Sequence, residues 1–198
     1  MIQYVNSSAG HKKSCSKGRI IMIKDFVKIK DISKELLKKY EGELPSDVLK
    51  IWNEYGLGTF YNGYLKVINP EEYKEVLEYS YFRGDVSIPV FATAFGDMII
   101  WQENQYVGIV KYRYGVSNII YDGFEYFIED VLEGFLDDKH LSIRQYNAAI
   151  KKYGVLEYDE CFGYIPLLAL GGKESVNNLK KVKIREHIAL ITEMAGEV

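Results

Sequence analysis

The 198-residue chain has little of what several classes of protein require. Its two cysteines, Cys15 and Cys161, lie far apart and away from any histidine cluster, so the sequence indicates neither a disulfide framework nor a zinc site. Its apolar runs are far shorter than the roughly 20 residues of a membrane-spanning helix. Gly171 and Gly172 precede a lysine, but the spacing of a phosphate-binding loop is absent. We therefore expect a protein without a metal, a cofactor or a membrane partner.

Catalytic groups are also sparse. The three histidines occur in unrelated parts of the chain. His187 lies among apolar residues, where we expect a structural role, because a general base needs a positioned partner. Glu157, Asp159 and Glu160 form an acidic cluster with no fixed spacing to any base. We expect no catalytic residues, and an enzyme that pairs His187 with these acids stays open as a third hypothesis.

The first 21 residues contain four basic residues and no acidic one. They are either a disordered basic arm or the product of a misassigned start, with the true initiator at Met22. We favour the second interpretation, because codons for Lys17–Arg19 can form a ribosome-binding sequence. The whole chain has a net charge of −3, and residues 22–198, with 21 basic and 28 acidic residues, carry −7. This balance argues against nucleic acid as a partner and favours a basic one.

The hydrophobic pattern predicts an α+β protein. Residues at helical spacing predict helices at Ile32–Tyr40, Asp47–Tyr55, Glu71–Tyr81, Leu141–Tyr153 and Ile184–Ala195. Strands are expected at Phe60–Ile68, Ile88–Phe95, Met98–Glu103, Tyr106–Tyr112, Val116–Tyr121 and Leu179–Lys183, with an irregular segment or short strand at Tyr158–Pro166. Gly96-Asp97 suits a two-residue hairpin turn. Together these elements predict a central antiparallel or mixed sheet of about four to six strands, with N-terminal and C-terminal helices packed on it.

The clearest predicted helix spans Phe124–Leu136. Its apolar residues recur as a wide stripe, of the kind that packs on a sheet. Its other face carries six acidic residues: Glu125, Glu129, Asp130, Glu133, Asp137 and Asp138. No basic residue occurs from Asp122 to Asp138. This face is either an ordinary solvated surface or a docking surface for a basic protein.

Two blocks of residues resemble a known family. The first contains Leu44-Pro45, Trp52, Thr93-Ala94-Phe95-Gly96-Asp97 and Trp101, and the second contains Gly163-Tyr164-Ile165-Pro166, Leu168-Ala169-Leu170-Gly171-Gly172 and His187. On these residues the chain resembles the GAD-like family and its companion, the C-terminal domain of type VI secretion immunity proteins. The topology is also similar to the broader SUKH superfamily of toxin-immunity proteins. The motif residues read as turns and core.

The resemblance implies a small cytoplasmic bacterial protein that neutralises a cognate toxin by stoichiometric binding, without catalysis. We expect the toxin to be a basic nuclease, bound through the acidic face. The alternative is a non-catalytic regulatory or scaffold module that binds a host protein or a small ligand. The expected organisation is an arm at 1–21, a GAD-like domain at 22–138, and an immunity-type subdomain at 139–198 packed on the first.

Overall fold

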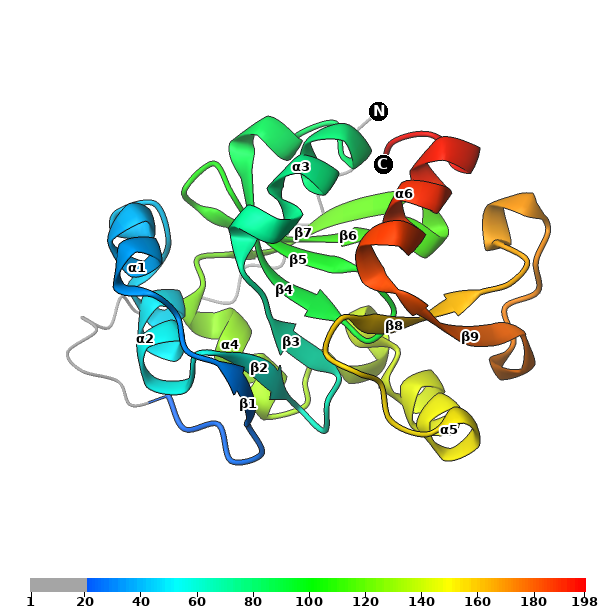
Figure 1. The fold of residues 1–198 in the computed structure, drawn as a ribbon, viewed down its shortest axis with the longest axis horizontal. Coiled ribbons are helices and arrows are strands. Elements are labelled where there is room, and N and C mark those ends of the chain that lie inside the picture. Colours follow the sequence, from blue (N-terminus) through cyan, green and yellow to red (C-terminus); the bar gives the residue numbers. More distant parts are fainter. Residues whose placement is uncertain (1–20) are drawn as a thin grey trace, which may run out of the picture.

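The computed structural model describes residues 21–198, so Cys15 and nearly all of the predicted basic arm lie outside the described residues. Its centre is a seven-stranded antiparallel sheet in which the strands follow one another in chain order, β1 to β7 (Figure 1). The strands are β1 (Val27–Lys30), β2 (Leu57–Phe60), β3 (Leu65–Val67), β4 (Ser87–Thr93), β5 (Met98–Gln102), β6 (Tyr106–Lys111) and β7 (Val116–Asp122). A separate hairpin pairs β8 (Glu160–Tyr164) with β9 (Leu179–Lys183). The predicted α+β class is confirmed, although the sheet is larger than expected.

The α-helices are α1 (Lys34–Tyr40), α2 (Ser46–Tyr55), α3 (Pro70–Ser80), α4 (Glu125–Leu132), α5 (Ile143–Tyr153) and α6 (Ile184–Ala195). Short 3₁₀ turns are η1 (Gly84–Val86), η2 (Tyr112–Tyr114), η4 (Leu168–Leu170) and η5 (Val176–Asn178), and η3 (Asp137–Leu141) is a π-helical turn. Within residues 21–198, no helix combines the length and apolarity needed to cross a membrane.

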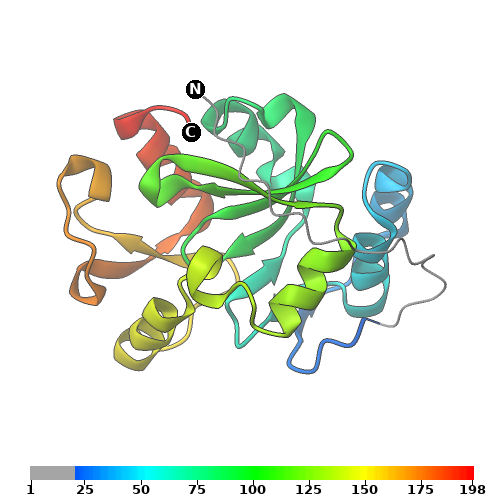
Figure 2. The same cartoon turned by 180° about the vertical axis from the view of Figure 1, so that it is seen from behind.

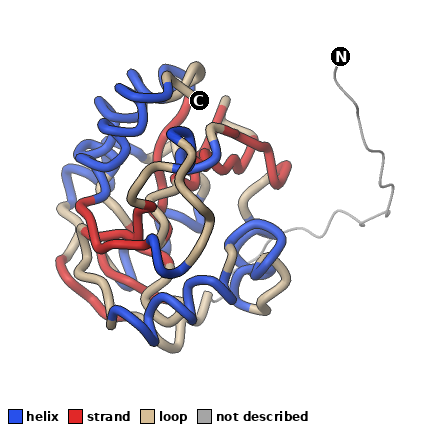
Figure 3. The backbone as a smooth tube through the Cα atoms, turned by 90° about the vertical axis from the view of Figure 1, so that its right-hand side faces the viewer, coloured by secondary structure: helices blue, strands red, loops and turns tan. Residues whose placement is uncertain are grey.

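Helices lie on both sides of the main sheet (Figures 1 and 3). Because side chains alternate along a strand, β5 sends Ile99 to one face and Ile100 to the other. The face of Ile100 packs against α3 and α6. The face of Ile99 packs against aromatic and aliphatic residues of α2, α4 and α5 (Figure 2). The central strands β4 to β6 are therefore buried on both faces, which explains their nearly continuous apolar sequence.

Two predicted turns differ from the structure. The strand with a glycine interruption expected at Phe60–Ile68 is instead the last residue of β2, a turn and β3, because Tyr61, Asn62 and Gly63 all have positive φ and reverse the chain. The turn between β4 and β5 also uses more than Gly96 and Asp97. Strand β4 ends at Thr93 and β5 begins at Met98, so the loop spans four residues, and the Thr93 N–H donates to the Asp97 carbonyl across it over 2.9 Å.

The predicted helix Phe124–Leu136 is also shorter than expected. Helix α4 ends at Leu132, and Gly134 follows with a φ of +78°. A glycine in this left-handed conformation commonly terminates a helix. The chain then turns through η3, so Phe135 does not join the buried stripe. Its side chain is 67% exposed.

Candidate functional site

The motif Thr93–Asp97 forms a tight, buried turn at the end of β4. The Thr93 hydroxyl oxygen accepts the backbone N–H groups of Phe95 and Asp97, each over 3.2 Å. Gly96 has a φ of +75°, and a Cβ there would lie 3.0 Å from the Cys161 sulfur. The turn therefore requires glycine, both for its backbone and for its contact with β8.

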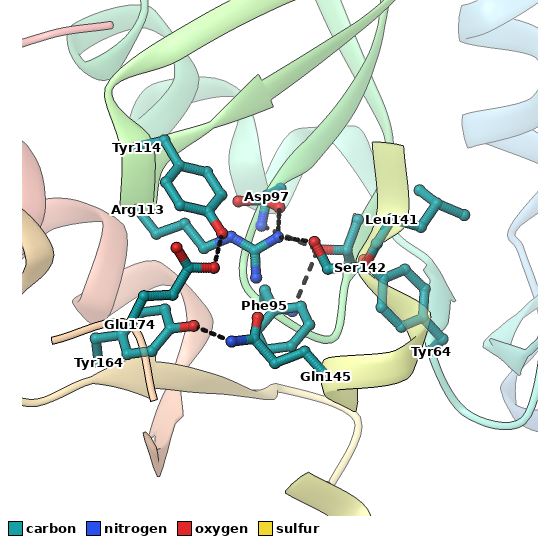
Figure 4. A network of polar contacts seen from close by, with 11 residues as sticks. Tyr64, Phe95, Asp97, Arg113, Tyr114, Leu141, Ser142, Gln145, Tyr164 and Glu174 are labelled. Carbon is teal, nitrogen blue, oxygen red and sulfur yellow. Dashed lines mark hydrogen bonds and ion pairs between the residues drawn. The ribbon is translucent and has the colours of Figure 1, made fainter. Parts of the chain in front are cut away.

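This turn delivers Asp97 to a buried ion pair. An Nη2 of Arg113, from η2, lies 3.2 Å from an Asp97 carboxylate oxygen, and both side chains are almost completely buried. The same Nη2 donates to the Ser142 hydroxyl over 3.2 Å. The guanidinium carbon lies 4.0 Å from the centre of the Phe95 ring and 4.8 Å from that of Tyr114 (Figure 4). Arg113 is thus enclosed by an acid and two aromatic rings.

The electrostatics of the pair follow from its burial. Burial raises the pKa of the Asp97 carboxyl group, and the Arg113 guanidinium opposes that rise. Burial alone would lower the pKa of Arg113, but attraction to Asp97 raises it. The contact has the distance of an ion pair without the geometry of a hydrogen bond. Among the described residues, both Asp97 oxygens and two Arg113 nitrogens, Nε and Nη1, lack a hydrogen-bond partner.

Residues from the C-terminal part of the chain close this cluster (Figure 4). The Gln145 amide nitrogen, on α5, donates to the Tyr164 hydroxyl of β8 over 2.5 Å. The Tyr114 hydroxyl donates to Glu174 over 2.6 Å. The cluster therefore joins β4 and η2 to α5, β8 and the loop before β9. Asp97 and Arg113 at its centre are sealed from solvent, whereas Tyr114 and Glu174 at its rim are exposed, so the arrangement suits cohesion between parts of the chain.

The two tryptophans of the motif lie elsewhere. Trp52 is buried in α2, where its ring meets that of Tyr40 edge-on at a centroid distance of 5.7 Å. The Trp101 indole N–H donates to the Asn104 side chain over 3.2 Å. Trp101 also lines an open groove of about 460 Å³ together with Tyr40 and Pro89. Lysines and acids both border this groove, so it has no dominant charge.

The two glycines of the second motif block, Gly171 and Gly172, form a tight turn that packs against the backbone before it. Gly171 has a φ of +82°, and a Cβ on Gly172 would lie 2.1 Å from the Pro166 carbonyl oxygen. A side chain at Gly172 is therefore excluded unless the backbone moves. Pro166 is exposed and follows a cis peptide bond. The loop is built by backbone packing.

His187 does not meet the acids that the enzyme hypothesis requires. It is buried in α6 against Gly163, where a Cβ would lie 2.4 Å from the histidine Nε2, and burial lowers its pKa. Asp159 and Glu160 face Lys183 instead, at 2.8 and 3.9 Å. Within residues 21–198, His187 has no hydrogen bond or ion pair with an acidic side chain, so nothing supports that acid–base site.

The six acids of the predicted docking face divide into two groups. Asp130 accepts the Tyr121 hydroxyl and Asp137 accepts the Tyr61 hydroxyl, while Asp138 pairs with Arg144. The tyrosine contacts connect α4 to β7 and η3 to the β2–β3 turn, and the Asp138–Arg144 pair connects η3 to α5. The carboxylates of Glu125 and Glu133 are exposed and make no hydrogen bond or ion pair within residues 21–198. Glu129 is half-buried and engaged within the chain.

Apolar side chains interrupt this acidic surface. Phe135 is held outward by its backbone, whose N–H donates to the Asp130 carbonyl over 2.8 Å. Leu132 is also partly exposed, so an apolar patch lies among the acids. The sequence pattern placed both residues in the core, and Gly134 was the local signal that the helix stops before Phe135. We call the acids of α4 and η3, with Leu132 and Phe135, the α4 surface.

The protein is thus an α+β protein in which one sheet with helices on both sides contacts a C-terminal hairpin through the residues that surround a buried ion pair. Two protein families match adjoining parts of the chain. The GAD-like domain matches residues 20–112, and the T6SS immunity protein Tdi1, C-terminal, matches residues 122–195. The predicted family resemblance is thereby confirmed, and the Asp97–Arg113 cluster lies where the two matched regions meet.

A solved structure supports the fold. The crystal structure of Atu4351 from Agrobacterium tumefaciens matches with a TM-score of 0.72 and 18% sequence identity, over 86% of this chain and 85% of that one. At this identity the likeness concerns the fold alone. None of the curated proteins compared with the chain matches it.

Proposed function

We propose that the protein is an immunity protein that neutralises a cognate bacterial toxin by direct, stoichiometric binding. The observation that carries the proposal is the pair of adjoining family matches, one of which is to a type VI secretion immunity protein. The charged pair of the motif cluster, Asp97 and Arg113, is buried, which agrees with a structural role for the motif. The toxin is expected to be a nuclease, and the complex to form in the cytoplasm.

The α4 surface is our proposed contact with the toxin. Residues 22–138 hold 21 acidic and 12 basic residues, whereas residues 139–198 hold 7 acidic and 9 basic ones, so the negative charge is concentrated in the first region. A nuclease that binds a polyanion presents a basic surface. The exposed Phe135 adds an aromatic side chain of the kind that anchors protein interfaces.

The test begins with capture of the partner by the tagged chain from its native bacterium, followed by purification of the captured toxin domain. Expressed alone in a sensitive host, that domain should arrest growth, and co-expression of the chain should restore it. Light scattering after size exclusion should give an equimolar complex. Arrest that persists despite soluble immunity protein, or absence of a complex, would reject the proposal.

The groove beside Trp101 motivates the alternative function of a regulatory module that binds a small ligand or a host protein. Its aromatic floor and mixed charges are compatible with a ligand that has an apolar body and polar ends. A Trp101→Phe variant should then lose capture of that ligand while it still neutralises the toxin. Equal loss of both activities would instead indicate a structural role for Trp101.

A further inference from the structure

The main sheet has two edges of very different character. Strand β1 forms one edge and is four residues long, with Lys28 and Lys30 on it and an irregular register against β2. Short length, lysines and bulges are the usual means by which proteins stop an edge strand from pairing with another chain. The β1 edge is therefore protected.

Strand β7 forms the other edge; like β1 it has one register shift, at Ile120, but it lacks the short length and the lysines of β1. It is seven residues long, and Val116 to Tyr121 include no charged residue and no proline. Val116 and Ile119 are 44% and 49% exposed. Within residues 21–198, β7 pairs only with β6. In an antiparallel edge strand, alternate residues turn their backbone N–H and C=O groups away from the neighbouring strand. Strand β7 thus presents available backbone donors and acceptors, in a row that the register shift at Ile120 interrupts.

The surroundings of β7 indicate what kind of chain would pair with it. Strand β7 runs directly into α4, and the Tyr121 hydroxyl donates to Asp130 on that helix. The free edge is therefore continuous with the α4 surface. An extended segment on β7 would lie beside Asp122 and Glu125, which are both exposed and acidic. Charge complementarity favours a basic segment there.

We infer that the β7 edge accepts an extended, basic segment of the toxin as an additional strand of the sheet. This inference rests on the proposed function and adds its binding mode. In such strand addition, backbone hydrogen bonds supply affinity and the neighbouring side chains supply specificity. Here the uncharged strand provides the hydrogen bonds, and the adjoining α4 surface selects for basic residues.

Hydrogen–deuterium exchange on the full chain, alone and with the purified toxin domain, tests the inference. Amides at alternate positions of Val116–Asp122 should exchange at least 10-fold more slowly in the complex, while β1 amides should stay unchanged. Complex formation with β7 exchange unaltered would overturn the inference and leave the proposed function intact. Absence of any complex would overturn both.

A pair of matched variants separates strand pairing from charge. Ile119→Asp adds a negative charge, which would strengthen a purely electrostatic contact, but a charge and a poor strand former on the edge oppose pairing. It should weaken toxin binding at least 10-fold. Ile29→Asp makes the same change on the β1 edge and should leave binding unaltered. Equal or tighter binding by Ile119→Asp would contradict strand addition.

A second copy of this chain is the other possible occupant. In that case, β7 amides would become protected as the concentration of the chain alone is raised, without toxin. Light scattering would report a dimer over the same range. That result would overturn the assignment of the edge to the toxin.

Discussion

The Asp97–Arg113 cluster and the α4 surface are both rich in charge, yet they differ in their exposure to water. The cluster is sealed, and its charges face each other across 3.2 Å with aromatic rings on the guanidinium. The α4 surface is open, and its charges have one sign. Opposite charges buried together stabilise one arrangement of the chain, whereas like charges in water remain available to a partner.

This contrast explains why the family motif is a poor guide to the proposed toxin-binding site. The turn and its ion pair depend on Thr93, Gly96 and Asp97. The second loop has no room for a side chain at Gly172. Such residues maintain the fold, so they reveal the family. A surface that discriminates between toxins must instead differ from one relative to the next.

The largest expected effect follows from removal of the buried acid. Asp97→Ala leaves Arg113 buried without its counter-ion, and we expect the free energy of unfolding to fall by about 3–5 kcal/mol. Urea denaturation measures this loss. A fall below about 1 kcal/mol would show that water reaches the cluster and screens it.

A double variant serves as the control for that prediction. Asp97→Ala with Arg113→Met removes both charges, so it should be less destabilising than the sum of the two single changes. Additive losses would mean that the two side chains contribute independently, and the contrast between a coupled cluster and an open surface would fail.

The next effect concerns a buried charge without a counter-ion. Lys66, in β3, has no exposed surface, and its amine donates to the Glu157 carbonyl over 3.1 Å. Burial lowers its pKa from 10.5 to about 8, with nearby acids opposing the change. Lys66→Met should therefore raise the free energy of unfolding at pH 7 by about 1–3 kcal/mol, since one pKa unit is worth about 1.4 kcal/mol and one hydrogen bond is lost.

The lowered pKa of Lys66 also predicts the direction in which the stability of the protein changes with pH. Between pH 8 and 10.5 the unfolded chain holds the Lys66 proton more firmly than the folded one, so this lysine makes stability increase as the pH rises. Measurements from pH 7 to 9.5 should show this increase in the wild type and its absence in Lys66→Met. Parallel curves for the two proteins would mean that Lys66 is neutral throughout or is reached by solvent.

The sequence predicted local patterns well and the buried cluster poorly. Apolar runs separated by turn residues identified the strands from Ile88 to Tyr121, and those of β4 to β6 are nearly continuous because their side chains face two apolar layers. The pattern missed β1, whose four residues are all exposed and carry no burial pattern. Arg113, Ser142 and Gln145 meet only through tertiary packing. Arg113 follows a strand in a Lys-Tyr-Arg-Tyr sequence that marks no contact with Asp97.

Charge reversal on the α4 surface should have the smallest effect on stability and a large effect on binding of the proposed toxin. Glu125→Lys with Glu133→Lys changes two exposed carboxylates of the α4 surface that have no partner within residues 21–198. Surface changes of this kind alter stability by about 0.5 kcal/mol or less. If α4 faces a basic toxin, the variant should bind it at least 10-fold more weakly, mostly through slower association that depends on salt.

The matched control is a variant with the same change of charge on the opposite face of the sheet. Glu75→Lys with Glu193→Lys alters α3 and α6, which cover the opposite face, and it should leave toxin binding within about 2-fold at 0.15 M salt, where charges more than about 8 Å apart are largely screened. Surface plasmon resonance at several salt concentrations compares the two variants. Equal weakening would indicate that net charge alone attracts the toxin. Unchanged binding by the Glu125 and Glu133 variant would remove α4 from the interface and leave its acids as a solvated face.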